Sequence, residues 1–267
     1  MPDKGHNQVK QAVAQHKLQR LKKLITRFEP TVDIGVKIST GFAPIDDYLM
    51  QGGGGGLPCG GVHEVVAARP GDMAAALGFA HRLAARFLAA SQDETILLYG
   101  QTHAAVREGG QPYAPALAAH DLSGVHLAYL DGVTLPDLLW AGEEALACPA
   151  IGCSLLASWD TAPDFTASRR LTLAARAATR PLLLTLGAAA AGTASAATTR
   201  WQLASAPRQG WQVTLTKSRL AYEAVPPPQG WTVYPQHKPL PMQELAVDGV
   251  PHDVKTPVPL MAAQRVS

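Results

Sequence analysis

Residues 67–74 occupy the place of a phosphate-binding loop but lack the residues that perform its chemistry. They have the sequence Ala-Ala-Arg-Pro-Gly-Asp-Met-Ala, whereas such a loop has the pattern Gly-x-x-x-x-Gly-Lys-Ser/Thr. Met73 and Ala74 stand at the lysine and hydroxyl positions, and they offer neither a positive charge nor a ligand for Mg²⁺. Asp72, which follows Gly71, places a carboxylate where anionic phosphates would lie. We therefore predict a strand–turn–helix connection with Asp72 as the helix cap, and no bound nucleotide cofactor.

Other residues that could bind metal or react as thiols are scattered. Cys59, Cys148 and Cys153 form no Cys-x-x-Cys pair, and the nine histidines form no cluster with cysteines or carboxylates at metal-ligand spacing. We predict no metal site. An odd number of cysteines indicates reduced thiols of a cytoplasmic protein.

The elements that must position the loop alternate between strands and helices in the middle of the chain. Apolar runs predict strands at 62–67, 95–99, 125–130, 152–158, 182–186 and 211–216, and helices are expected at 43–50, 72–90, 112–119, 136–147 and 166–178. Continuous apolar strands favour an α/β fold with a mostly parallel sheet that helices cover on both faces. The small, uncharged segment Gly187 to Thr199 is predicted to be a flexible loop.

Residues 1–30 are predicted to form a basic amphipathic helix. Apolar residues recur there at helical spacing, and no acid lies between Asp3 and Glu29. The basic residues are Lys10, Lys17, Arg20, Lys22, Lys23 and Arg27. Two interpretations are open: a solvated helix docked by its apolar stripe, or a site for an anionic partner such as DNA or an acidic protein surface.

Residues 223–267 differ in composition from the rest of the chain. Prolines recur between Pro226 and Pro259, with few periodic apolar residues, which predicts a disordered tail. Its isolated apolar residues, such as Trp231 and Leu245, are candidate anchors for a partner.

Charge and hydropathy set further bounds on the function. A net charge of +2 is too small to indicate nucleic-acid binding by itself. The hydrophilic N-terminus predicts no secretory signal. The uncharged run from Pro181 to Thr199 is rich in Gly, Ala, Ser and Thr, so we expect a buried strand and a loop rather than a membrane span.

Several segments together resemble the ImuA family, RecA-like bacterial proteins of SOS mutagenesis. The first is residues 39–66, from Ser-Thr-Gly-Phe-Ala-Pro through the glycine run to Val-His-Glu-Val-Val. The others are Asp137-Leu-Leu-Trp-Ala-Gly-Glu-Glu-Ala-Leu146, Ser168-Arg-Arg-Leu-Thr-Leu-Ala-Ala-Arg176 and the closing segments around Arg200–Ala206 and Gly210–Arg219. The resemblance implies a RecA-like core over residues 35–222 with a degenerate phosphate loop.

The resemblance also implies partners and a pathway. ImuA proteins act in translesion DNA synthesis with ImuB, a Y-family polymerase relative, and with an error-prone C-family DNA polymerase, and they are thought to contact RecA. It thus predicts a non-enzymatic accessory protein of the cytoplasm, associated with the nucleoid during the damage response. Two alternatives are a divergent ATPase that takes its phosphate ligands from elsewhere, and an SOS cell-division inhibitor similar to SulA.

A RecA-like core assigns expectations to four further residues. Gln101 is the closest match to a catalytic Glu just past a core strand, and an amide cannot act as that base. Asp160 resembles the Mg²⁺-holding Asp of such ATPases, although we favour an ordinary turn or cap residue. Lys217 and Arg219 resemble the basic pair that reaches the neighbouring nucleotide in a RecA filament. The chain is therefore expected to add to a filament end and to block further growth.

Overall fold

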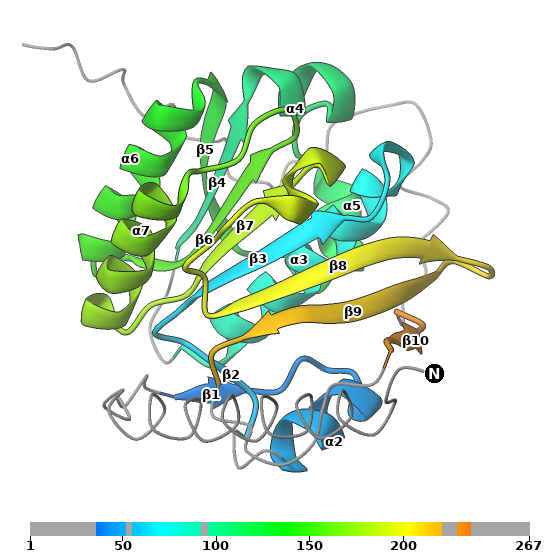
Figure 1. Cartoon of the computed structure of the whole chain (residues 1–267). Coiled ribbons are helices and arrows are strands. Elements are labelled where there is room, and N and C mark those ends of the chain that lie inside the picture. Colours follow the sequence, from blue (N-terminus) through cyan, green and yellow to red (C-terminus); the bar gives the residue numbers. More distant parts are fainter. Residues whose placement is uncertain (1–35, 52–54, 92–95, 221–228, 236–267) are drawn as a thin grey trace, which may run out of the picture. The chain divides into compact units, whose positions relative to one another are not determined.

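The computed structural model describes residues 36–51, 55–91, 96–220 and 229–235, which all belong to a unit spanning residues 34–267 (Figure 1). The predicted basic helix of residues 1–30 and most of the predicted tail of residues 223–267 lie outside the described residues.

An eight-stranded mixed sheet forms the centre of the described region. Its strands are β3 (Val62–Ala67), β4 (Ile96–Thr102), β5 (His126–Val133), β6 (Ile151–Ser158), β7 (Leu182–Leu186), β8 (Thr199–Ala206), β9 (Gly210–Ser218) and β10 (Trp231–Val233). Their order is β10-β9-β8-β3-β7-β6-β4-β5. Every pair from β8 to β5 is parallel, while β9 runs antiparallel to β8 and to β10. The predicted α/β fold with a mostly parallel sheet is confirmed.

Helices cover both faces of this sheet (Figure 1). On one face α3 (Met73–Ala89) packs with α2 (Ala43–Gln51) and the short α5 (Ala114–Ala119), and on the other lie α6 (Leu135–Ala147) and α7 (Phe165–Ala178). The remaining elements are β1 (Lys37–Ile38), β2 (Leu57–Pro58), α4 (His103–Gly109) and the 3₁₀ turns η1 (Pro70–Asp72) and η2 (Ala188–Gly192).

Strand periodicity explains the two cores. Val65 and Leu155 face α3, whereas their neighbours Val66 and Leu156 face α6 and α7, because successive side chains point to opposite faces of a sheet. A strand buried on both faces favours apolar residues on both sides, which made β7 (Leu-Leu-Leu-Thr-Leu) and β3 (Val-His-Glu-Val-Val-Ala) predictable as strands. β3 nevertheless buries two polar residues, His63 and Glu64.

The structure adds elements that the sequence pattern did not predict. β8 interrupts its apolar residues with Arg200 and Gln202, so its sequence is less apolar than that of β7. The predicted flexible loop of residues 187–199 contains η2, and the backbone N–H of Thr198 donates to the carbonyl of Val62 at 2.8 Å. That loop is ordered by contacts with distant strands, which local composition does not reveal.

Part of the predicted disordered tail is a strand. β10 pairs with β9, Val233 is 4% exposed, and the ring of Trp231 lies 5.4 Å from that of Tyr48. The prediction for residues 223–267 is therefore wrong for residues 229–235. Apolar side chains of this segment find partners on α2 and β8, which are remote in sequence.

Candidate functional site

Met73, at the position where a phosphate loop was expected to have its lysine, lies inside the apolar core. Met73 begins α3, is only 6% exposed and belongs to the core that includes Phe79 and Trp201. Ala74 and Gly71 are exposed, and a Cβ added to Gly71 would meet no atom within 4 Å. The loop therefore presents small exposed residues and a buried thioether, with no cation at the lysine position.

Asp72 does not cap α3 with its side chain, contrary to the sequence prediction. Its carboxylate accepts hydrogen bonds from Arg69 Nε at 2.9 Å, Arg69 Nη2 at 3.3 Å and the backbone N–H of Ser205 on β8 at 2.9 Å. The hydrogen bond from Arg69 is the main reason that the pKa of Asp72 lies below its usual value. The carboxylate of Asp72 thus binds the N–H donors of Arg69 and Ser205 beside the N-terminus of α3. An anionic ligand would be favoured at the same place.

Gln101 lies within β4 rather than beyond the end of the strand, because the strand continues to Thr102. The side chain is 1% exposed, and its amide donates to the carbonyl of Gly110 at 3.1 Å. Its oxygen accepts from the hydroxyl of Tyr129 at 2.9 Å. These bonds tie the segment after α4 to the neighbouring strand β5, so Gln101 has a structural role here.

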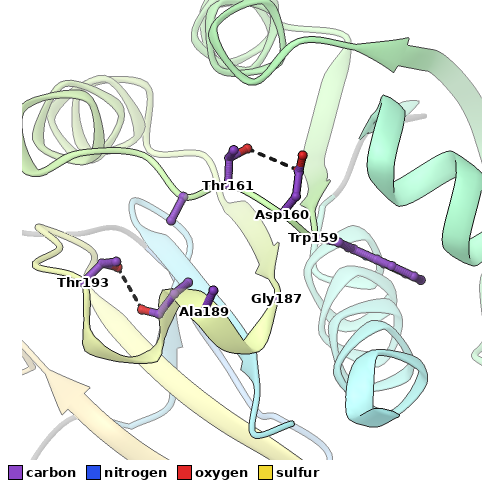
Figure 2. Close-up of a pocket in the computed structure, with 8 residues that line it drawn as sticks. Trp159, Asp160, Thr161, Gly187, Ala189 and Thr193 are labelled. Atoms are coloured by element: carbon purple, nitrogen blue, oxygen red, sulfur yellow. Dashed lines mark hydrogen bonds between the residues drawn. The ribbon is translucent and has the colours of Figure 1, made fainter. Parts of the chain in front are cut away.

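Asp160 lies just beyond the carboxyl end of β6 and lines a pocket of about 220 Å³. The other lining residues are Trp159, Thr161, Ala162, Gly187, Ala189, Ala190 and Thr193. Figure 2 shows that the ring of Trp159 points away from the group formed by Asp160, Thr161 and Thr193. Asp160 is exposed and accepts a long, 3.4 Å hydrogen bond from the hydroxyl of Thr161. In the described part of the chain no lysine or arginine lines this pocket.

A buried ionic cluster that the sequence analysis missed lies next to η2. Glu64, in the middle of β3, is fully buried and accepts from Arg200 Nε at 2.6 Å and from the hydroxyl of Ser195 at 2.7 Å. Arg200 also donates to the carbonyl of Thr193 at 2.6 Å and to that of Ala190 at 3.3 Å. A single acid within the apolar run of β3 was the available signal, because a buried carboxylate requires a partner.

The structure separates the two members of the predicted basic pair. Lys217, on β9, is partly buried, and its ammonium donates to the carbonyl of Ser195. Burial is the main cause of the lowered pKa of Lys217, and the charge of Arg219 adds to it. Arg219 follows the end of β9 and is exposed. Arg219 is therefore the member of the pair that is available to a partner, while Lys217 holds the loop beside η2.

The remaining site predictions can be placed briefly. Lys10, Lys17, Arg20, Lys22, Lys23 and Arg27 lie outside the described residues. Within the described ranges, no group of three or more His, Cys, Asp and Glu side chains could hold a metal ion. No helix there combines the length and the apolar character needed to cross a bilayer.

Comparison of the chain with known proteins finds no matching protein-family model and no match among the curated proteins.

Proposed function

We propose that this chain is a non-catalytic, ImuA-like protein that acts through protein contacts in an SOS-induced translesion-synthesis complex. Its proposed partners are an ImuB-like relative of the Y-family polymerases and RecA, with an error-prone C-family DNA polymerase joined indirectly. The observation that carries the non-catalytic part is the phosphate-loop position, where Met73 is buried in the core and Asp72 is held by Arg69 and Ser205.

The position of the degenerate loop supports the RecA-like part of the proposal. The unit β3–η1–α3 is a strand, a turn and a helix, as in phosphate-loop proteins, and β3 lies between parallel neighbours in the interior of the sheet. The chain then crosses from β7 on one side of β3 to β8 on the other, and ligands of open α/β sheets bind at such crossing points. This topology supports the proposal that the fold keeps the location of a nucleotide site, while Met73 and Ala74 lack the groups that would bind phosphate and Mg²⁺.

The proposal is tested by damage-induced mutagenesis in the host of this gene. Deletion of the gene should lower the frequency of ultraviolet-induced mutation, and the intact chain should restore it. Asp160→Asn should restore it equally well, because no metal-dependent step requires that carboxylate. A deletion strain with normal induced mutagenesis would contradict the proposed pathway.

The divergent ATPase is the second candidate, and the exposed carboxylate of Asp160 in its pocket is the observation that favours it. Calorimetry with MgATP separates the two candidates. We expect no binding in the micromolar range. Micromolar binding that is lost in Asp160→Asn would favour the divergent ATPase instead.

A further inference from the structure

The outer surface formed by α6 and α7 carries opposite charges on its two helices. All charged residues of α6 are acidic, namely Asp137, Glu143 and Glu144, and all those of α7 are arginines, namely Arg169, Arg170 and Arg176. The two helices lie side by side on one face of the sheet (Figure 1). They run in the same direction, because each connects two parallel strands.

This surface also exposes large apolar side chains. Trp140 on α6 and Leu173 on α7 are each 54% exposed. Trp140 stands one turn before Glu144, and Leu173 stands one turn after Arg169, so each helix presents one apolar and one charged residue on its outer stripe. Within the described residues neither Glu144 nor Arg169 forms an ion pair.

From these features we infer that the α6–α7 surface binds a second copy of this chain through a two-fold symmetric contact. A rotation axis that lies in the contact plane, parallel to the helices and between them, places α6 of each copy over α7 of the other. The acidic helix then faces the basic helix twice, once on each side of the axis. A surface that complements itself in this way is what an isologous dimer requires.

The height of the side chains along the helices fits this arrangement. Glu143 and Arg170 form an ion pair of 2.7 Å within one copy, which puts them at a similar height along the two parallel helices. If Glu143 and Arg170 are taken as the common level, each neighbouring residue lies about 1.5 Å further along its helix axis. Arg169 on α7 then lies at a height between those of Trp140 and Glu144 on α6. Across the axis, Arg169 of one copy can therefore contact the carboxylate of Glu144 and the ring face of Trp140 in the other.

The test uses charge reversal in the full-length chain, followed by sedimentation equilibrium over a concentration series. Glu144→Arg alone and Arg169→Glu alone should each weaken dimerisation by about 100-fold, because like charges then meet twice across the axis. An equimolar mixture of the two variants should dimerise again, since the introduced arginine would face the introduced glutamate and the other contact would keep its native pair. Both residues are exposed, so thermal unfolding should be the same for variants and wild type at a protein concentration at which all of them are monomeric.

Matched controls are Glu108→Arg and Arg208→Glu, which reverse exposed charges of the same signs away from α6 and α7. They should leave the dimer intact. A wild-type chain that is monomeric throughout the series, a single variant that still dimerises, or a mixture that remains monomeric would each overturn the inference.

Discussion

Met73 and Asp72 are consecutive in the sequence and meet different surroundings. Met73 is packed among core side chains at the start of α3, and Asp72 is bound by the guanidinium of Arg69 and the backbone of Ser205. Both positions are thus committed to holding the loop against β8 and the core. At the scale of single residues, a lysine introduced at position 73 is therefore expected to disturb the core rather than to create a phosphate site.

This leads to a prediction for Met73→Lys. Placing an ammonium group at a position that is 6% exposed should lower the free energy of unfolding by roughly 2–4 kcal/mol, since a buried charge without a partner is costly. Met73→Leu is the control, and its cost should stay below about 1.5 kcal/mol because side-chain volume and polarity are kept. Both values come from urea denaturation, with MgATP binding measured alongside. A fully stable Met73→Lys variant that binds ATP would contradict this account.

Asp72 should give the protein a characteristic dependence on acid. Because its pKa is lower in the folded chain than the ordinary value of 3.8, the carboxylate stabilises the fold above that pH, and the contribution is lost as pH falls through the folded pKa. Asp72→Asn should therefore unfold at a lower temperature than wild type at neutral pH. The two melting temperatures should converge in acid. A difference that persists or grows as pH falls would show that another group is responsible.

At the scale of secondary-structure elements, the segment between β7 and β8 depends on an ion pair buried beneath it. Arg200 on β8 satisfies Glu64 on β3 and also the carbonyl groups of Ala190 and Thr193. One side chain therefore joins two neighbouring strands and η2. Removing either charge would leave the other buried and unpaired.

We expect Arg200→Met to cost about 3–5 kcal/mol of unfolding free energy, since it leaves the fully buried carboxylate of Glu64 unpaired. The double variant Glu64→Gln, Arg200→Met should recover much of that loss, because no unpaired charge remains. Urea denaturation measures the unfolding free energies of the single and the double variant. Hydrogen exchange at the backbone N–H groups of Ala190 and Thr193 reports on the stability of η2. If the loss of unfolding free energy in the double variant equals the sum of the losses in Arg200→Met alone and Glu64→Gln alone, the two charges are not coupled.

The C-terminal strand provides a second test at this scale. Deletion of residues 226–267 removes β10, whereas deletion of residues 236–267 keeps it. The longer deletion should be less stable than the shorter by roughly 2–4 kcal/mol, because the rings of Tyr48 and Trp201 lose Trp231 and the site of buried Val233 is vacated. Equal melting temperatures for the two deletions would show that β10 contributes nothing to stability.

At the scale of the whole molecule, the described unit and the basic segment of residues 1–30 have separate proposed roles. The pocket beside Asp160 has no cationic side chain among its lining residues in the described chain, so it offers no ionic contact for phosphate groups. The strongest concentration of positive charge in the sequence lies between Lys10 and Arg27. Any affinity for DNA is therefore expected to come mainly from that segment.

Replacing Lys17, Arg20, Lys22 and Lys23 by Gln tests this expectation. DNA affinity should fall, and the slope of log affinity against log salt should become shallower by about 3, close to the value for four lost contacts with single-stranded phosphates. Fluorescence anisotropy over a salt series measures the slope, with Arg208→Gln as a control. Unchanged binding of both DNA and protein partners would leave this segment as a solvated helix face.

The sequence by itself determined the α/β class, the boundaries of β3 and β7 and the lack of a lysine or hydroxyl side chain at positions 73 and 74. Those features follow from local properties, namely predominantly apolar runs and the identity of Met73 and Ala74. Only the tertiary structure decided which side chains meet. Ser205 and Arg200, the partners of Asp72 and Glu64 on β8, lie more than a hundred residues away in the sequence.

The same physical reason accounts for the incorrect predictions. β10 and the ordered segment around η2 have no local pattern that distinguishes them from loops, because their stability comes from contacts with α2, β3 and β9. The spacing of Lys217 and Arg219 left open whether the ammonium of Lys217 is free, and only the fold shows that it donates to the carbonyl of Ser195. Spacing in the sequence fixes the face of a strand, whereas the environment of that face depends on the whole fold.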